Sequence, residues 1–180
     1  MRNYLFYTKL PVQPADVAVV LYGDEAENRE NEAVRLIKNK LASNIYYPLY
    51  NRSYSVSSNN KIEEKSDTLL SIAGFNYLRK DQAIKHYENT HIELLVAKDY
   101  IRRNHFKKII FVSSSYHMRR IKLISEELFD ENVELYYSSP EQYIKGLGWL
   151  INRREIKFVF SEYAKIAWFL FYRSFMPIPI

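Results

Sequence analysis

Two runs of apolar residues limit what this chain can fold into more than any other feature of the sequence. They read "ADVAVVLYG" at positions 15–23 and "KIIFV" at positions 108–112. A strand with one exposed face alternates apolar and polar residues, whereas an unbroken apolar run is typical of a strand buried on both faces of a parallel sheet. The two runs therefore predict strands inside a parallel sheet that is covered by helices.

The remaining segments predict helices and strands in alternation. Helices are expected where apolar residues recur at helical spacing, namely over 28–41, 61–78 and 90–104, from about 116, and over 153–171. Further strands are expected at 83–86 and 132–137, and a short apolar piece lies at 44–50. The polar stretch "NRSYSVSSNNK", 51–61, has the composition of a mobile loop. This order predicts a single domain over residues 1–180, an α/β protein folded as a three-layer α/β/α sandwich with a mainly parallel sheet.

Composition excludes several classes of protein. Of the 180 residues 47% are hydrophobic, which is enough for a sizeable core. The 26 Lys and Arg against 21 Asp and Glu give a formal charge of +5, which favours anionic ligands. The basic residues form no long run, so we expect no nucleic acid partner. The absence of cysteine excludes disulfide scaffolds, thiolate zinc sites and cysteine nucleophiles.

Neither end of the sequence predicts export or a membrane span. Lys9, Gln13 and Asp16 interrupt the apolar core that a signal peptide would need. The longest apolar run, "IAWFLFY" at 166–172, is much shorter than the roughly 20 residues of a helical span. We therefore expect a cytoplasmic protein without a transmembrane segment. The aromatic helix near the carboxyl end is expected to cover the sheet, or alternatively to contact a membrane surface.

The stretch "IIFVSSSYHMRR", 109–120, places polar groups directly behind a buried strand. Ser113 and Ser114 would offer hydroxyl and backbone N–H groups at the positive end of a helix, which suits a phosphate or carboxylate. His117 and Arg120 lie one helical turn apart and would share one face of that helix. The serines can equally cap the helix while His117 forms a hydrogen bond in the core, and the sequence leaves both readings open.

Other polar residues follow the first strand. Gly23 is a single glycine where a dinucleotide-binding fingerprint needs three, so an ordinary NAD-binding domain is not expected. Asp24 lies at the carboxyl end of that strand, where ligands bind in open α/β sheets. Arg29, a few residues later, either holds an anion at the same edge or is a surface arginine.

The segment "YENTHIELL" also has two interpretations. Thr90 and Glu93 have the spacing of a capping box, which would satisfy free backbone donors at the start of a helix, but both can also face a ligand. His91 and His117, with Asp24 or Glu64, lack the spacing of any recognised metal motif, so no metal site is predicted.

Taken together, these segments resemble the YdcF-like family, which includes envelope proteins of the SanA and ElyC type. The resemblance rests on "ADVAVVLYG" followed by Arg29, on "NTHIE" at 89–93, on "FVSSSYHMRR" at 111–120, and on "SEYAKIAWFLFYR" at 161–173. The chain differs from the family in having one glycine in the first motif, where two or three are usual, and in lacking the family's Ser-Gly-Gly segment.

The resemblance implies a Rossmann-like domain with a polar pocket at the carboxyl edge of the sheet. It implies His117 and Arg120 as the key pair, places Glu162 on the closing helix's motif, and carries Glu64 over from a glutamate of the middle segment. Envelope maintenance and binding of S-adenosylmethionine are functions linked to members of the family.

We therefore expect a pocket for a small anionic or nucleotide-like ligand, with S-adenosylmethionine or a phosphorylated metabolite as candidates. The predicted ligand-binding residues are Gly23, Arg29, Glu64, Asn89, Thr90, Glu93, Ser113, Ser114, Arg120 and Glu162. One alternative is a phosphoryl-transfer or hydrolytic enzyme with His117 and Asp24 as catalytic residues. Another is a membrane-surface or protein-interaction module.

Overall fold

The computed structural model describes residues 2–23, 26–56, 61–65, 78–81, 86–140 and 153–175. Its helices are α1 (Arg2–Leu5), α2 (Ala26–Lys38), α4 (Asn89–Arg103), the short 3₁₀ helix η2 (Ser115–His117), α5 (Met118–Leu128) and α6 (Arg153–Phe175). Its strands are β1 (Val17–Val20), β2 (Asn44–Tyr47), β3 (Arg52–Val56), β4 (Ile62–Lys65), β5 (Lys108–Val112) and β6 (Glu134–Ser138).

The strands form one six-stranded mixed sheet in the order β4-β3-β2-β1-β5-β6. The pairs β2–β1, β1–β5 and β5–β6 are parallel, while β2–β3 and β3–β4 are antiparallel. The α/β class is thus confirmed, but the sheet is less uniformly parallel than predicted. Only residues 48–51 separate β2 from β3, and a parallel crossover needs about a dozen residues or more, so these strands can pair only as a hairpin.

Two sequence predictions beside this hairpin are wrong. The segment predicted as a loop contains β3, in which Tyr54 and Val56 pack toward one face and Ser53 is buried on the other. This two-residue period is typical of a strand, but the surrounding serines and asparagines obscure it. Residues 62–65, predicted as helical, form β4. Residues 66–77 of the same predicted helix lie outside the described part. So do residues 83–85 of the predicted strand 83–86, and its last residue, His86, lies in a turn.

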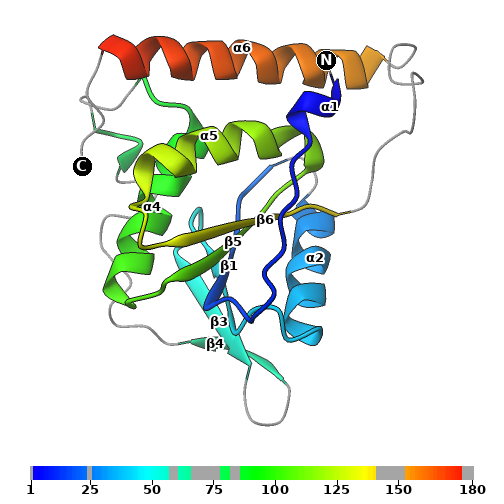
Figure 1. The fold of residues 1–180 in the computed structure, drawn as a ribbon, viewed down its shortest axis with the longest axis vertical. Helices are drawn as coiled ribbons and strands as arrows, with labels where there is room; N and C mark the ends of the chain where they lie inside the picture. Colours follow the sequence, from blue (N-terminus) through cyan, green and yellow to red (C-terminus); the bar gives the residue numbers. More distant parts are fainter. Residues whose placement is uncertain are drawn as a thin grey trace.

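Helices cover both faces of the central strands. On one face, α2 packs its Ala33 and Leu36 against Ala18 of β1 and Val112 of β5. On the other face, α4 and α5 pack against the alternate residues of the same strands, in a cluster of buried residues that includes Val17, Val19, Ile92, Val96, Ile109, Phe111, Ile121 and Ile124. Figure 1 shows α2 and α4 on opposite sides of the strands. Because β1 and β5 are buried on both faces, their apolar runs are unbroken.

Helix α6 lies across one end of the molecule, above α5 (Figure 1). Val159 and Ile166 pack with Leu5 of α1 and Tyr116 of η2. Phe169 and Tyr172 join the main core. No helix among the described residues is long and apolar enough to cross a membrane.

The strand order changes direction at β1. The chain passes from β1 to β2 on one side, and later returns through α4 to β5 on the other side. In open α/β sheets, ligands bind beyond the carboxyl ends of the strands at such a switch point. Gly23 follows β1 and Ser113 follows β5, so both residues lie at this place in the fold.

Candidate functional site

A cavity of about 390 Å³ opens at the carboxyl ends of β1 and β5. Its walls come from the ends of β1, β2 and β5, the first turns of α4, the start of α5 and the middle of α6. The lining residues are Leu21, Tyr22, Gly23, Leu49, Asn89, Thr90, Glu93, Ser113, His117, Arg120 and Lys165. Seven residues that the sequence predicts for the site therefore lie around one space: Gly23, Asn89, Thr90, Glu93, Ser113, His117 and Arg120.

Arg120 is held by carboxylates from two other segments. Its Nε donates to Oε2 of Glu162 at 2.7 Å and its Nη2 donates to Oε1 at 3.1 Å, which makes a bidentate pair. Its Nη1 donates to Oε2 of Glu88 at 2.9 Å, just before α4. The side chains of Arg120 and Glu162 are 4% and 1% exposed, so solvent water stabilises neither charge to any large extent. Arg120 thus joins α5 to α6 and to the start of α4.

His117 shares the same carboxylate. Its Nδ1 lies 3.0 Å from Oε1 of Glu162 and 3.3 Å from Nη2 of Arg120, and both are candidate hydrogen-bond partners. Burial alone would raise the pKa of Glu162, but the hydrogen bond from His117 and the charge of Arg120 hold it well below its usual range. An ionised carboxylate is the stronger partner, so Nδ1–H donates to Glu162 and the arginine contact is only a close approach.

This orientation determines what His117 can do. Burial lowers the pKa of His117, although Glu162 opposes the effect, so the ring is predominantly neutral at neutral pH. With the proton on Nδ1, the other ring nitrogen, Nε2, is a hydrogen-bond acceptor. His117 therefore offers an acceptor or a proton acceptor at the wall of the cavity.

Glu162 also binds a second cation, Lys165, one turn further along α6. The Nζ of Lys165 donates to Oε1 of Glu162 at 2.9 Å. The Lys165 side chain is 40% exposed and lines the cavity, whereas Glu162 lies behind the wall. Lys165 is consequently the cation of the cluster that a ligand can reach most easily.

Glu93 enters the site from α4 and binds the end of β1. Its Oε1 accepts a hydrogen bond from the backbone N–H of Tyr22 at 2.9 Å. Burial raises the pKa of Glu93 to about 7, although this hydrogen bond and the charges of Arg29 and Arg120 act in the opposite direction. The capping-box interpretation is wrong, because the N-cap residue is Glu88 and no side chain caps the helix there.

Arg29 lies behind the cavity wall and is only 1% exposed. Its Nη1 donates to the carbonyl oxygen of Leu21 at 2.7 Å, and its Nε and Nη2 donate to Oγ of Ser114 at 3.1 and 3.0 Å. A Cβ atom on Gly23 would lie 2.4 Å from Nη2, so the glycine is needed for this close approach. Arg29 and Ser114 thus connect α2 to the ends of β1 and β5, and neither is among the lining residues.

The other predicted residues lie elsewhere. Glu64 is on the outermost strand β4, where it pairs with Arg52 at 3.6 Å and is 54% exposed, away from the cavity lining. Asp24 lies outside the described residues. His91 is buried and its Nδ1 is 2.7 Å from the hydroxyl of Tyr172. Among the described residues, no group of three His, Asp or Glu side chains is arranged to hold a metal ion.

Sequence reasoning missed Lys165, Glu88 and Tyr22. A signal for Lys165 was available, because it follows Glu162 by three residues and shares its helix face. Glu88 and Tyr22 act through tertiary contacts that no local pattern reveals. No family model matches this chain, and no curated protein or solved structure is significantly similar to it.

We expect Arg120→Ala to destabilise the fold by about 3–5 kcal/mol, because it removes the bidentate partner of the buried Glu162 and the partner of Glu88. Arg120→Lys keeps the charge but loses the bidentate geometry, so its stability should lie between those of the wild type and Arg120→Ala. The control is Arg119→Ala, since Arg119 donates to the exposed backbone oxygen of Tyr4. Urea denaturation measures all three, and equal stabilities for Arg120→Ala and Arg119→Ala would contradict the buried network.

We expect Glu93 to make stability depend on pH. Its pKa rises from 4.5 to about 7 on folding, so the folded state binds its proton more tightly. The contribution of protonated Glu93 to the unfolding free energy is fully present below the pKa that Glu93 has in the unfolded state. It is lost as the pH rises through the pKa that Glu93 has in the folded state. Relative to Glu93→Gln, the wild type should lose about 3 kcal/mol of unfolding free energy between about pH 4.5 and 8. Parallel stability curves for the two proteins would show that Glu93 is not perturbed.

Proposed function

We propose that the cavity binds a small anionic ligand, either a phosphorylated metabolite or a nucleotide-like molecule such as S-adenosylmethionine. The observation that carries this proposal is the convergence of Lys165, Arg120 and the amino-terminal end of α4 on one cavity. Each of the three favours negative charge. The position of the cavity at the switch point of the sheet supports the same conclusion.

The start of α4 contributes through its backbone. Asn89 and Thr90 are the first two residues of the helix, and both line the cavity. The first turn of a helix carries N–H groups without partners in the helix and the positive end of the helix dipole. No acidic residue lies in this first turn, and the carboxylate of Glu88 is engaged by Arg120. A phosphate or carboxylate group would complete this end of the helix.

We infer a Rossmann-like three-layer arrangement, because α2 packs on one face of the parallel strands and α4 and α5 pack on the other. Membership of the YdcF-like family and a link to the cell envelope rest on the sequence resemblance alone. The anion-binding proposal does not depend on either of them.

A thermal-shift panel of pyrophosphate, adenine nucleotides, S-adenosylmethionine and sugar phosphates tests the proposal. A compound at a hundred times its dissociation constant should stabilise the fold by about 2.7 kcal/mol. Lys165→Ala should weaken binding by about tenfold or more, because a hydrogen bond to a charged group is lost. The control is Lys157→Ala, an exposed lysine two turns earlier on α6. If no compound shifts the transition, the cavity is not an anion site.

A second candidate function is hydrolysis or transfer of a phosphoryl group, and the paired His117 and Glu162 favour it. Nε2 of His117 would accept the proton of an attacking water, and Glu162 would stabilise the imidazolium that forms. Glu93, with its pKa near 7, would protonate the leaving oxygen from the same cavity. Asp24, the other predicted catalytic residue, lies outside the described residues.

Release of phosphate from a panel of phosphate esters, with and without added Mg²⁺ or Mn²⁺, tests this candidate. His117→Gln should reduce turnover by about a hundredfold or more, the usual contribution of a general base. Glu162→Gln should impair turnover as well, with a changed pH profile. Equal turnover in wild type and His117→Gln would exclude the mechanism.

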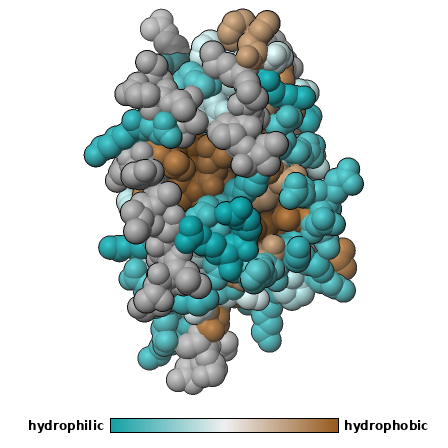
Figure 2. Space-filling model, turned by 90° about the vertical axis from the view of Figure 1, so that its left-hand side faces the viewer, coloured by the Kyte–Doolittle hydropathy of each residue, from teal (hydrophilic) through white to brown (hydrophobic). Residues whose placement is uncertain are grey.

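A third candidate is contact with a membrane surface through the outer side of α6. Phe169 is buried, but Trp168, Phe171 and Phe175 are 42%, 54% and 73% exposed. The rings of Trp168 and Phe171 stack, and Phe175 contacts Phe171 at a tilted angle. Figure 2 shows apolar side chains at the top of the molecule, where the carboxyl end of α6 lies. Cosedimentation with anionic lipid vesicles tests this candidate. Phe171→Ser should reduce binding, and no cosedimentation of the wild type would rule it out.

A further inference from the structure

Two exposed tyrosines stand at the edge of the cavity. Tyr22 follows β1 and is 55% exposed, and Tyr50 follows β2 and is 57% exposed. Their rings meet edge to face, with centroids 6.2 Å apart. Leu49 lies beside Tyr50 and lines the cavity together with Tyr22. Aromatic rings that are this exposed contribute little to a core, and their faces are available to a ligand at the cavity.

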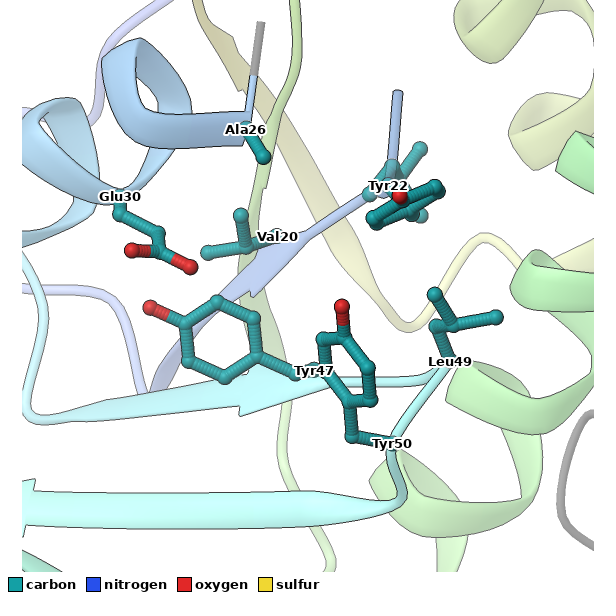
Figure 3. A pocket seen from close by; sticks show the side chains of 8 residues that line it. Val20, Tyr22, Ala26, Glu30, Tyr47, Leu49 and Tyr50 are labelled. Carbon is teal, nitrogen blue, oxygen red and sulfur yellow. The ribbon is translucent and has the colours of Figure 1, made fainter. Parts of the chain in front are cut away.

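The tyrosines line a second hollow that adjoins the cavity (Figure 3). This hollow lies between the carboxyl ends of β1 and β2 and the start of α2, and its lining residues are Val20, Leu21, Tyr22, Ala26, Glu30, Tyr47, Leu49 and Tyr50. Its volume of about 20 Å³ holds about one water molecule, so a larger group would lie over its rim. Leu21, Tyr22 and Leu49 line the cavity as well. The polar cavity therefore continues directly onto an aromatic surface.

The aromatic surface widens further from the cavity. Glu30, Tyr47 and Tyr50 also line a groove of about 360 Å³ that runs along β2 and β3. The groove adds Tyr54, whose ring meets that of Tyr47 edge to face with centroids 5.7 Å apart. A molecule that enters the cavity thus has room to extend beyond Tyr22 over a surface that includes the rings of Tyr47, Tyr50 and Tyr54.

One carboxylate faces this surface. Figure 3 shows the carboxylate of Glu30 next to the hydroxyl end of Tyr47. Burial and the nearby Glu30 and Tyr54 raise the pKa of Tyr47 to about 12, so its hydroxyl keeps its proton and remains a donor. Glu30 is exposed, and no ion pair involves it within the described part of the chain. The hollow thus combines ring faces with one strong acceptor and one donor.

We propose that the exposed rings of Tyr22 and Tyr50 and the adjoining groove along β2 and β3 form a subsite for the base of a nucleotide whose phosphate groups lie in the cavity. The proposal rests on the anion-binding function and specifies its ligand class. A nucleobase is planar and stacks on tyrosine faces. Its exocyclic amino group or the ribose hydroxyls would donate to Glu30. The carboxylate beside the rings would then accept hydrogen bonds from the uncharged part of the nucleotide.

The experiment compares two probes of similar charge, inorganic pyrophosphate and adenosine diphosphate, by isothermal titration calorimetry. Only the second carries a base and a ribose. We expect adenosine diphosphate to bind at least about fivefold more tightly, since stacking on one aromatic residue contributes about this factor or more. Tyr50→Ala should remove about tenfold of the nucleotide affinity and leave pyrophosphate binding unchanged. Tyr50→Phe, which keeps the ring, should retain the affinity.

The control is Tyr4→Ala, because Tyr4 is 48% exposed but belongs to α1, away from the residues that line the hollow. Equal affinities of the two probes would overturn the base subsite while leaving the anion site intact. Equal weakening of both probes by Tyr50→Ala would also overturn it, since the tyrosine would then act on the cavity as a whole. Failure of both probes to bind would overturn the subsite together with the anion-binding function.

Discussion

The buried ion pair between Arg120 and Glu162 is the interaction on which the rest of the site depends. It connects α5 to α6, and the second bond of Arg120 to Glu88 adds the segment that starts α4. Charges that are this deeply buried cost more to desolvate than they return unless every donor and acceptor is matched. The network is therefore better understood as fixing how three helices meet around the cavity than as a large source of stability.

The charges around the cavity are nearly balanced, and the balance can change. Arg29, Arg120 and Lys165 supply the cations, while Glu88, Glu93 and Glu162 supply the acidic groups. Glu162 stays ionised because it binds Arg120, His117 and Lys165. Glu93, with its pKa raised to about 7 by burial, is the group whose protonation changes near neutrality. A bound anion would stabilise its protonated form, so ligand binding and proton uptake are coupled at this residue.

The sequence predicted the central part of this arrangement because its signals are local. The runs containing β1 and β5 are apolar without interruption, and Ser113, His117 and Arg120 follow the second run at helical spacing. The edge of the sheet was not predicted, because β3 is rich in serine and β4 reads "IEEK", which resembles a helix surface as much as a strand. The pairing of β3 with β2 and of β4 with β3 decides their conformation, and pairing is not a local property.

Residue roles were harder to predict than residue positions. Arg29 and Arg120 were expected to clamp an anion, but Arg29 is engaged by Leu21 and Ser114, and Arg120 by Glu162 and Glu88. Glu93 was expected either to cap α4 or to face a ligand, and it lines the cavity while it binds the backbone of Tyr22. Which partner a long charged side chain selects depends on the meeting of distant segments, and a single sequence does not specify this.

The ionised Glu162 fixes the proton of His117 on Nδ1 and leaves Nε2 as the acceptor of a side chain that lines the cavity. Nitrogen-15 NMR of the histidine side chains measures the tautomer directly, and His117→Gln assigns the signal. We predict that neutral His117 carries its proton on Nδ1 in the wild type and loses this preference in Glu162→Gln. A wild-type His117 protonated on Nε2 would contradict this assignment of the proton, since Nδ1 would then accept from Arg120 and Glu162 would not orient the ring.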